Sequence, residues 1–561
     1  MTPSLKNKFF IIALLLKLFT FAGSTSAAEE PYDLLIRNGR IVDGTGNPWF
    51  YGDVGVKGDR IVFIGRKATR PAKKIIDASG LVVSPGFIDI HSHSDYLLLE
   101  DGHAQSKIRQ GVTTEVLGEG GSAGPFTGKL NEKHIRVNGK TVILKSLGDY
   151  FKTVERAGIS TNVASYVGIG NIWQCVMGTS FDRPTKSQIA AMQNLVDAAM
   201  RDGALGLSSQ VMMPPGSLAN TDDIVALCKV VAKYRGIYST HIRNEGTGVF
   251  KAVKEAIEIG ERANVGVDII HLKIADQQYW GRMNEIVALI EAARKRGVNV
   301  QANVYPYTRG NNNLVSIIPP WAHEGGRAKL IERLKNPKLR ARLKRDIRNG
   351  IPGWYNHYTA VGGDWSRMLV SANNSYRGLT MDRVMKARTQ GKKNVDTLDE
   401  LFKILIEEGG SVSTVYAHHT DKDMTHALKQ PWCSVGSDGS AYAIKGPLRR
   451  GNPHPRNFGT FPRVLGVYVR ELKLLRLEDA VRKMTSLNAT KIGLRDRGLL
   501  QKGHYADITI FNPKTVIDKS TYTEPFQYPV GIEYVIVNGK LVLNRDKHTG
   551  AKPGRALRRQ P

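Results

Sequence analysis

The middle of the chain alternates between short apolar runs and longer segments in which apolar residues recur every three or four positions. The apolar runs are strand candidates: GFIDIHSH, TTEVLGEG, NVASYVGIG, GALGLSSQV, GIYSTHIR, VDIIHLK, VNVQANVYPY and WCSVGSDG. Segments such as KSQIAAMQNLVDAAMRDG and RMNEIVALIEAARKRG lie between several of them and have the period of amphipathic helices. Strand, helix and strand at this spacing predict parallel strands joined by helical crossovers.

Eight such units predict a closed (β/α)8 barrel, similar to a TIM barrel, over residues 85–487. An open doubly wound sheet is the alternative, but the chain has no Gly-x-Gly-x-x-Gly turn to support it. One long interruption, at about 317–413, separates the seventh and eighth strand candidates and is rich in Lys and Arg. We expect its helices to form an inserted subdomain. Because loops that follow barrel strands lie over the active site, this subdomain is a candidate lid or wall of the site.

The two ends of the chain share a different pattern, with short β-like runs between Gly and Asp turns. Examples are DLLIRNGRIVDG near the start and IEYVIVNGKLVLNRDKHTG near the end. Residues 29–84 and 488–561 are therefore expected to form one small β-sandwich together. The fold class predicted for the whole chain is α/β.

The first 28 residues have the features of a secretory signal peptide. Lys6 and Lys8 precede an apolar stretch, and small residues end it at Ala27 and Ala28. Lys17 interrupts the stretch, so a poor membrane anchor is the alternative. No later segment approaches the ~20 apolar residues that a membrane span needs. We therefore expect an exported protein, periplasmic or secreted, with no stable membrane insertion after cleavage.

The chain carries a formal net charge of +29, which favours anionic ligands. It has no zinc finger, basic helix or aromatic stacking motif, so we expect no nucleic-acid partner. We interpret the charge mainly as solvation, with a bias toward carboxylate substrates. Three cysteines, none in a Cys-x-x-Cys pair, do not make a disulfide framework, and each is expected to be a small buried residue.

Several strand candidates end in side chains that bind metals. His91 and His93 follow the first candidate and project to the same face, because alternate residues of a strand do so. His241 ends the fifth candidate, His271 the sixth and Asp438 the eighth. Each residue alone fits a structural role. Together, at the end of the barrel where such enzymes place catalytic groups, they predict a metal site.

Nine motifs give the chain a recognisable resemblance: PGFIDIHSHSD, QGVTTEVLGEGG, GALGLSS, THIRNEG, HLK, NVYPYTRG, SVGSDG, HPRNFGTFPRVLG and KPGRALRR. With these it resembles the amidohydrolase superfamily and, within it, the D-aminoacylase (N-acyl-D-amino-acid deacylase) family. The resemblance implies a hydrolase of the acyl-amide bond of small N-acyl-D-amino acids, with one or two divalent ions, zinc being expected. Alternatives are a dipeptidase or cyclic-amide hydrolase of the same superfamily, or a non-catalytic metal-binding scaffold.

One expected ligand departs from the family. Superfamily members often bridge two metals with a carboxylated lysine on the fourth strand, where GALGLSSQV has none. D-aminoacylases use a cysteine after the second strand, and Gly120 stands at that position here. We expect the neighbouring Glu119 to be the ligand instead, although it could pair with a base such as Lys273. We expect the tighter ion on His241, His271 and Glu119, and a second ion among His91, His93 and Asp438.

The remaining roles follow from the resemblance. Asp438 is the expected general acid/base, which takes a proton from a metal-bound water and gives it to the leaving amine. The expected partners of the substrate carboxylate are Lys273, Tyr305 and Arg456.

The residues expected to set the choice of substrate match the family pattern less well. The family usually has Ser where Asn311 stands and Tyr where Met213 stands. His418 and His419 form a pair in YAHHTDKD, and we expect both to be exposed, the alternative being that they reach the pocket.

Overall fold

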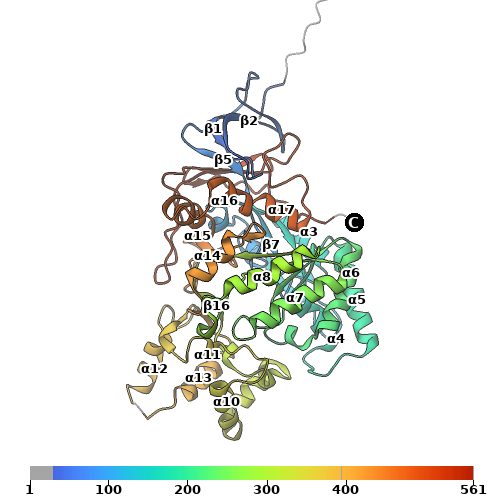
Figure 1. The fold of residues 1–561 in the computed structure, drawn as a ribbon, viewed down its shortest axis with the longest axis vertical. Coiled ribbons are helices and arrows are strands. Elements are labelled where there is room, and N and C mark those ends of the chain that lie inside the picture. The colour runs from blue at the N-terminus through green and yellow to red at the C-terminus, as the bar shows by residue number, and fades with distance from the viewer. Residues whose placement is uncertain (1–29, 393, 560–561) are drawn as a thin grey trace, which may run out of the picture.

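The computed structural model describes residues 30–559 with the exception of residue 393. The expected signal peptide, residues 1–28, lies outside this part of the chain. Within it, no helix combines the length and the hydropathy that a membrane crossing requires. Figure 1 shows three parts in a row: a sheet with β1 and β2 at the top, a barrel in the middle, and a helical lobe with α10, α12 and α13 at the bottom.

The central part is a ring of short parallel strands. In chain order they are β6 (Phe87–Asp89), β7 (Val112–Leu117), β10 (Asn162–Ser165), β11 (Val167–Gly168), β12 (Gly206–Gln210), β13 (Ile237–His241), β14 (Gly266–Ile269), β15 (Val300–Val304) and β19 (Cys433–Val435). Successive strands pair in parallel, and only Tyr166 separates β10 from β11, which together make one barrel strand. A parallel bridge between Ser92 and Gly439 joins the last strand to the first. The predicted barrel is confirmed, and each of the eight apolar runs is one of its strands.

Helices cover the outside of the barrel. They include α3 (Leu147–Ala157), α4 (Ile169–Met177), α5 (Lys186–Arg201), α6 (Thr221–Lys233), α7 (Val249–Ala263), α8 (Met283–Lys295), α14 (Asp421–Lys429), α15 (Arg456–Arg463), α16 (Leu477–Met484) and α17 (Ser486–Ile492). Helices α5 and α6 begin at capping boxes, in which the cap side chain and a side chain three residues later each satisfy a free backbone N–H. Their buried faces join the strands in one large apolar core.

The two chain ends share one mixed sheet. It contains β1 (Leu34–Ile41), β2 (Phe50–Lys57), β3 (Arg60–Gly65), β4 (Ile75–Asp77) and β5 (Val82–Pro85), with β20 (Ile508–Phe511), β21 (Ile532–Val537), β22 (Lys540–Asn544) and β23 (Lys547–His548). Strand β5 pairs antiparallel with β20, and this pairing joins the halves. The prediction that both ends build one domain of strands is confirmed, and its nine strands form one continuous sheet where a β-sandwich was expected. Because β5 runs almost directly into β6, the sheet also fixes where the first barrel strand starts.

The helical lobe begins and ends at two paired strands. Strand β16 (Gly310–Asn313) pairs antiparallel with β18 (Ser413–Tyr416), which also pairs with β17 (Met368–Val370). Between them lie α9 (Gly326–Lys335), α10 (Pro337–Asn349), α11 (His357–Ala360), α12 (Met381–Thr389) and α13 (Thr397–Glu407). The lobe has its own apolar core, which includes Leu314, Leu343 and Leu401. We call it the insert; it follows β15 and so lies at the carboxyl ends of the barrel strands.

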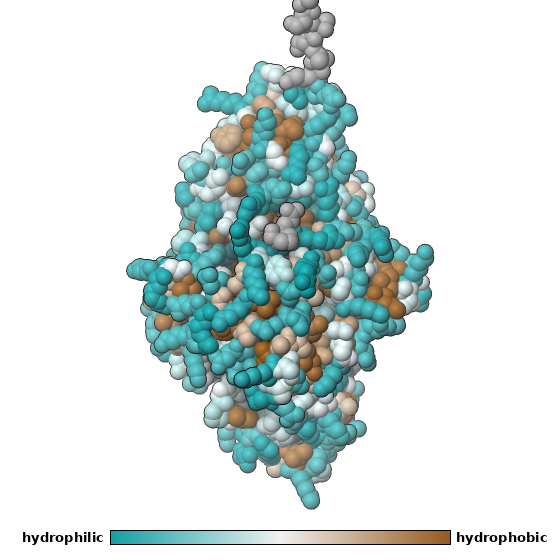
Figure 2. Space-filling view, turned by 90° about the vertical axis from the view of Figure 1, so that its right-hand side faces the viewer, coloured by the Kyte–Doolittle hydropathy of each residue, from teal (hydrophilic) through white to brown (hydrophobic). Residues whose placement is uncertain are grey.

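Figure 2 shows a face that is mostly hydrophilic, with hydrophobic residues in small separate groups. Cys175, Cys228 and Cys433 are all buried and unpaired, as expected.

Candidate active site

The carboxyl ends of the barrel strands bring the predicted metal-binding residues into one cluster. His91 and His93 follow β6, His241 is the last residue of β13, His271 follows β14 and Asp438 follows β19. All are buried except His93, which is half-buried. A cavity of about 270 Å³ opens onto this cluster and is also lined by residues of the insert.

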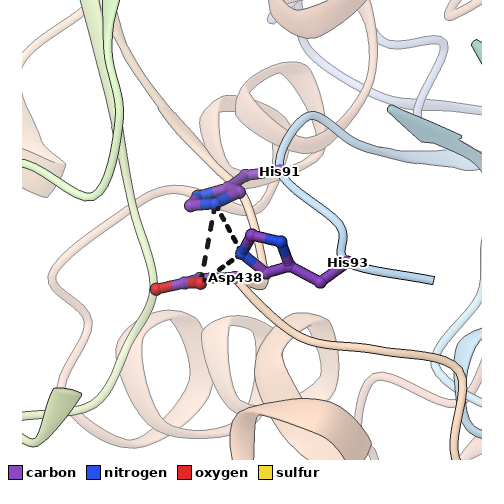
Figure 3. A group of neighbouring side chains, drawn as sticks. All are labelled: His91, His93 and Asp438. Atoms are coloured by element: carbon purple, nitrogen blue, oxygen red, sulfur yellow. Dashed lines mark hydrogen bonds and ion pairs between the residues drawn. The ribbon is translucent and has the colours of Figure 1, made fainter. Parts of the chain in front are cut away.

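Three candidate ligands, His91, His93 and Asp438, lie close enough together to share one ion, and Figure 3 shows them. His93 Nε2 lies 3.1 Å from His91 Nε2 and 3.0 Å from Asp438 Oδ1, and His91 Nε2 lies 3.5 Å from the same oxygen. Their candidate ligand atoms all fall within 4.8 Å of one another. Two imidazole nitrogens and a carboxylate oxygen aimed at one point are a suitable donor set for zinc.

A second pair of imidazoles completes the cluster. His241 Nδ1 lies 2.6 Å from His271 Nε2, and the His91 ring centroid lies 5.2 Å and 5.3 Å from those two rings. Burial, together with the charge of His271, holds the pKa of His241 well below its usual value. His241 is therefore neutral and carries the free lone pair that a metal ligand needs.

Two residues of the cluster have an unusual backbone. His271 has φ +41° and Asp438 has φ +51°, in the left-handed region that residues other than glycine adopt at a cost. In the segment GSDG the aspartate itself, and neither glycine, adopts this conformation. Strain at the ends of β14 and β19, which flank β15 in the barrel, implies that the surrounding structure holds these side chains in place.

Glu245 orients His271 and was not identified from the sequence. Its Oε1 lies 3.0 Å from His271 Nδ1 and 2.7 Å from Lys273 Nζ, while Lys273 Nζ also lies 2.7 Å from His271 Nδ1. Burial opposes ionisation of Glu245, but Lys273 and His271 outweigh it and hold its pKa well below the usual value. A carboxylate behind an imidazole is typical of metal-binding histidines. Its position in THIRNEG, four residues after His241, was the available clue.

Glu119 lines the same cavity but lies outside the group of three ligands in Figure 3. Its carboxylate accepts hydrogen bonds of 3.2 and 3.3 Å from Ser239 Oγ, and burial and the charge of Asp268 raise its pKa well above the usual value. It does not pair with Lys273, which binds Glu245 instead. Gly120 has φ +74°, and a Cβ built there would lie 2.7 Å from Gln210 Cβ. This backbone therefore leaves no room for a cysteine at position 120.

Of the expected substrate-binding residues, Arg456 and Tyr305 stack beside Asp438. Arg456 Nη1 lies 2.7 Å from Asp438 Oδ2, and its guanidinium carbon is 4.8 Å from the Tyr305 ring centroid. Burial opposes ionisation of Asp438, but Arg456 and His91 outweigh it and hold its pKa well below the usual value. Among the described residues, Arg456 Nε and the Tyr305 hydroxyl have no hydrogen-bond partner although they are buried. These free donors fit a bound anion.

The expectation that His418 and His419 are exposed is wrong. Both are buried, because the chain returning from the insert packs them against the barrel. His419 Nε2 donates to the Tyr307 carbonyl at 2.9 Å, and its Nδ1 lies 2.9 Å from His418 Nδ1. His418 lines the cavity with Asn311, Asn312 and His357, a further residue that sequence reasoning missed. Met213 does not line it.

With this geometry in place, comparisons with known proteins are informative. The model described as "Amidohydrolase family" matches residues 74–308 and 433–543, and the unmatched residues between them contain the insert. The D-aminoacylase of Alcaligenes xylosoxydans xylosoxydans is 34% identical over 534 residues, covering 95% of this chain and 98% of that protein. The N-acyl-D-glutamate deacylase of the same organism is 33% identical and covers 95% and 97%.

Solved structures give the same result. N-acyl-D-glutamate deacylase from Bordetella bronchiseptica, complexed with zinc and a phosphonate that mimics the tetrahedral intermediate, superposes with a TM-score of 0.78 at 31% identity. A D-aminoacylase structure superposes with a TM-score of 0.77 at 32% identity. Each match covers 94% of this chain and 100% of the other.

Proposed function

Because this chain belongs to the amidohydrolase family, we propose that it is a metal-dependent hydrolase of N-acyl-D-amino acids. It cleaves the acyl-amide bond and releases a carboxylate and a free D-amino acid. The observation that carries the proposal is the group His91, His93 and Asp438, with the free donors of Arg456 and Tyr305 beside it. The relatives named for this activity, which match almost the full length, support the choice of substrate class.

The donor set fits one or two divalent ions, and zinc is the ion that we propose. His91, His93 and Asp438 would hold one ion. The His241–His271 pair with Glu119 would hold the other ion, with higher affinity. His241 Nδ1 and His271 Nε2 lie 2.6 Å apart, close enough for one cation to be held by both rings. A carboxylate at Glu119 in place of the family's thiolate would make the site more tolerant of metals that prefer oxygen ligands.

The residues of the site divide the chemistry among them. A bound zinc ion lowers the pKa of water and polarises a carbonyl. Asp438 is ionised and so can take the proton of the attacking water at a carboxylate oxygen and pass it to the leaving nitrogen as the C–N bond breaks. Glu245 keeps the His271 ring in one orientation through its Nδ1.

The substrate carboxylate is proposed to bind at the cationic side of the cavity. Arg456 Nε and the Tyr305 hydroxyl supply free donors there, and a charge-assisted hydrogen bond to a carboxylate is stronger than a neutral one. Lys273, although paired with Glu245, adds positive charge to the same side.

Turnover of matched substrates tests the proposal. The zinc-loaded protein is assayed for amine release from N-acetyl-D-amino acids, from their L enantiomers and from D-containing dipeptides. We expect the highest kcat/KM on the N-acetyl-D series. Preference for the dipeptides would place the enzyme elsewhere in the family, and a metal-bound protein inactive on all of these substrates would contradict the assignment as an N-acyl-D-amino-acid hydrolase.

A further inference from the structure

Two lysines are completely buried inside the barrel, directly behind the site. Lys107 Nζ lies 2.7 Å from Asp89 Oδ2, and Lys491 Nζ lies 2.7 Å from Asp268 Oδ1; all four side chains have an exposed fraction of 0%. Desolvating such a pair costs so much that apolar replacements are often neutral or stabilising. Two such pairs behind one site therefore call for a role other than stability.

The first pair holds the chain on both sides of Asp438. Lys107 Nζ donates to Ser437 Oγ at 2.8 Å and to the Gly439 carbonyl at 2.9 Å. Asp89 accepts from the Ser437 backbone N–H at 2.8 Å. The pair thus fixes both neighbours of a residue whose left-handed backbone is costly without such support.

The second pair reaches His271 through one intermediate. Lys491 Nζ also donates to Ser434 Oγ at 2.8 Å, and Asp268 Oδ2 accepts from Asn303 Nδ2 at 2.9 Å. Asn303 Oδ1 in turn accepts the His271 backbone N–H at 3.0 Å. His271, the other residue of the cluster with a left-handed backbone, is therefore also held by a buried lysine–aspartate pair.

We propose that Lys107 and Lys491 are positioning residues: each, with its aspartate, fixes one of the two left-handed residues, Asp438 and His271, in the conformation that metal binding and turnover require. Neither lysine lines the cavity, so each acts through its neighbours. The predicted change in turnover rests on the proposed function, whereas the predicted change in zinc affinity can be tested without it.

The test removes each pair without leaving a lone buried charge. The variants are Lys107→Met with Asp89→Asn, and Lys491→Met with Asp268→Asn; asparagine keeps an acceptor oxygen. Lys483→Met is the matched control. Lys483 is a buried lysine that donates to the Gln430 and Cys433 carbonyls near the start of β19, and it has no carboxylate partner in the described chain.

Zinc affinity is measured by competition with a chelator on the full-length protein, alongside kcat, KM and the melting temperature. We expect both double variants to bind zinc about 10–100-fold more weakly, as loss of outer-shell support does. When saturated with zinc they should lose about 10²-fold in kcat, the cost of a 1 Å misplacement. KM should change little, because substrate contacts remain. Lys483→Met should lower only the melting temperature.

Double variants with wild-type zinc affinity and kcat, or with a melting loss alone, would overturn the proposal. If a double variant does not fold, a single alanine variant replaces it: Ser434→Ala for the Lys491 pair, or Ser437→Ala for the Lys107 pair, where it removes the hydroxyl that links Lys107 and Asp89 to the turn. It should weaken zinc binding and kcat in the same direction with a melting temperature no lower than that of Lys483→Met, and wild-type zinc affinity and kcat would again refute positioning. If the wild type is inactive on N-acyl-D-amino acids, the proposed function fails while the zinc comparison still decides this inference.

Discussion

At the scale of single residues, Asp438 combines three roles that can be separated. It contacts His93, pairs with Arg456 and adopts a left-handed backbone. Asp438→Asn keeps the size and removes the base, so kcat should fall by about 10²–10⁴-fold, the usual contribution of proton transfer. Zinc content of the tighter position and the melting temperature should stay close to wild type, as measured by elemental analysis and thermal unfolding. An asparagine variant within a few-fold of wild-type kcat would rule out the acid/base role.

Glu245 gives a second prediction at this scale. Glu245→Gln removes the charge behind His271, which lowers the basicity of that imidazole. Zinc affinity should fall by about 10–100-fold, measured by chelator competition. Glu258→Gln, on the exposed side of α7 where Glu258 pairs with Arg262, is the matched control and should bind zinc as wild type does. Equal affinities for the two variants would exclude an orienting role for Glu245.

At the scale of elements, the short pair of β16 and β18 controls the wall of the cavity. A Cβ at Gly310 would lie 2.8 Å from the His418 ring, which is buried and held by His419. Gly310→Ala should therefore lower the free energy of unfolding by about 1–3 kcal/mol, the usual cost of overpacking, and reduce kcat/KM. Because Gly310 has no left-handed φ, backbone strain does not confuse the result.

The same clash has a direct control. Adding His418→Ala to Gly310→Ala makes room for the new methyl group. In denaturant unfolding, the double variant should therefore lose less stability than the sum of the losses of the two single variants. Additive losses would show that the alanine does not meet His418.

At the scale of the whole molecule, metal binding should couple to stability, because the ligands come from strands at both ends of the barrel sequence. Zinc that binds only the folded protein stabilises it by about 2.7 kcal/mol at a free concentration of 100 times Kd. Removal of metal with a chelator should abolish turnover and lower the melting temperature, and zinc should restore both. Magnesium, which binds imidazole poorly, is the control and should restore neither.

Export is also a property of the whole chain. We propose cleavage near Ala28, based on Lys6, Lys8 and the apolar stretch that follows. Amino-terminal sequencing of protein from the exported fraction checks this, and an intact Met1 there would contradict a cleaved signal.

The sequence by itself determined the barrel and most of the residues that we propose to bind metal. Strand period, helix period and capping are local properties, so eight apolar runs could be placed in order, and histidines at their ends had to meet at one rim. The resemblance to the family could also be recognised from the sequence alone, because it rests on short motifs. His91, His93, His241, His271 and Asp438 were located for this reason.

Only the tertiary structure decided which partners these residues have. Asp438 N–H bonds to the His91 carbonyl across 347 residues, and Lys107 reaches Ser437 across 330. No local period encodes such contacts, because they arise from closure of the barrel. His418 and His419 look exposed in a polar segment, yet the return of the chain from the insert buries them. In the sequence Glu245 is an ordinary acidic residue. Packing places it against His271 and Lys273, where the low dielectric of the interior strengthens the interaction of its charge with both.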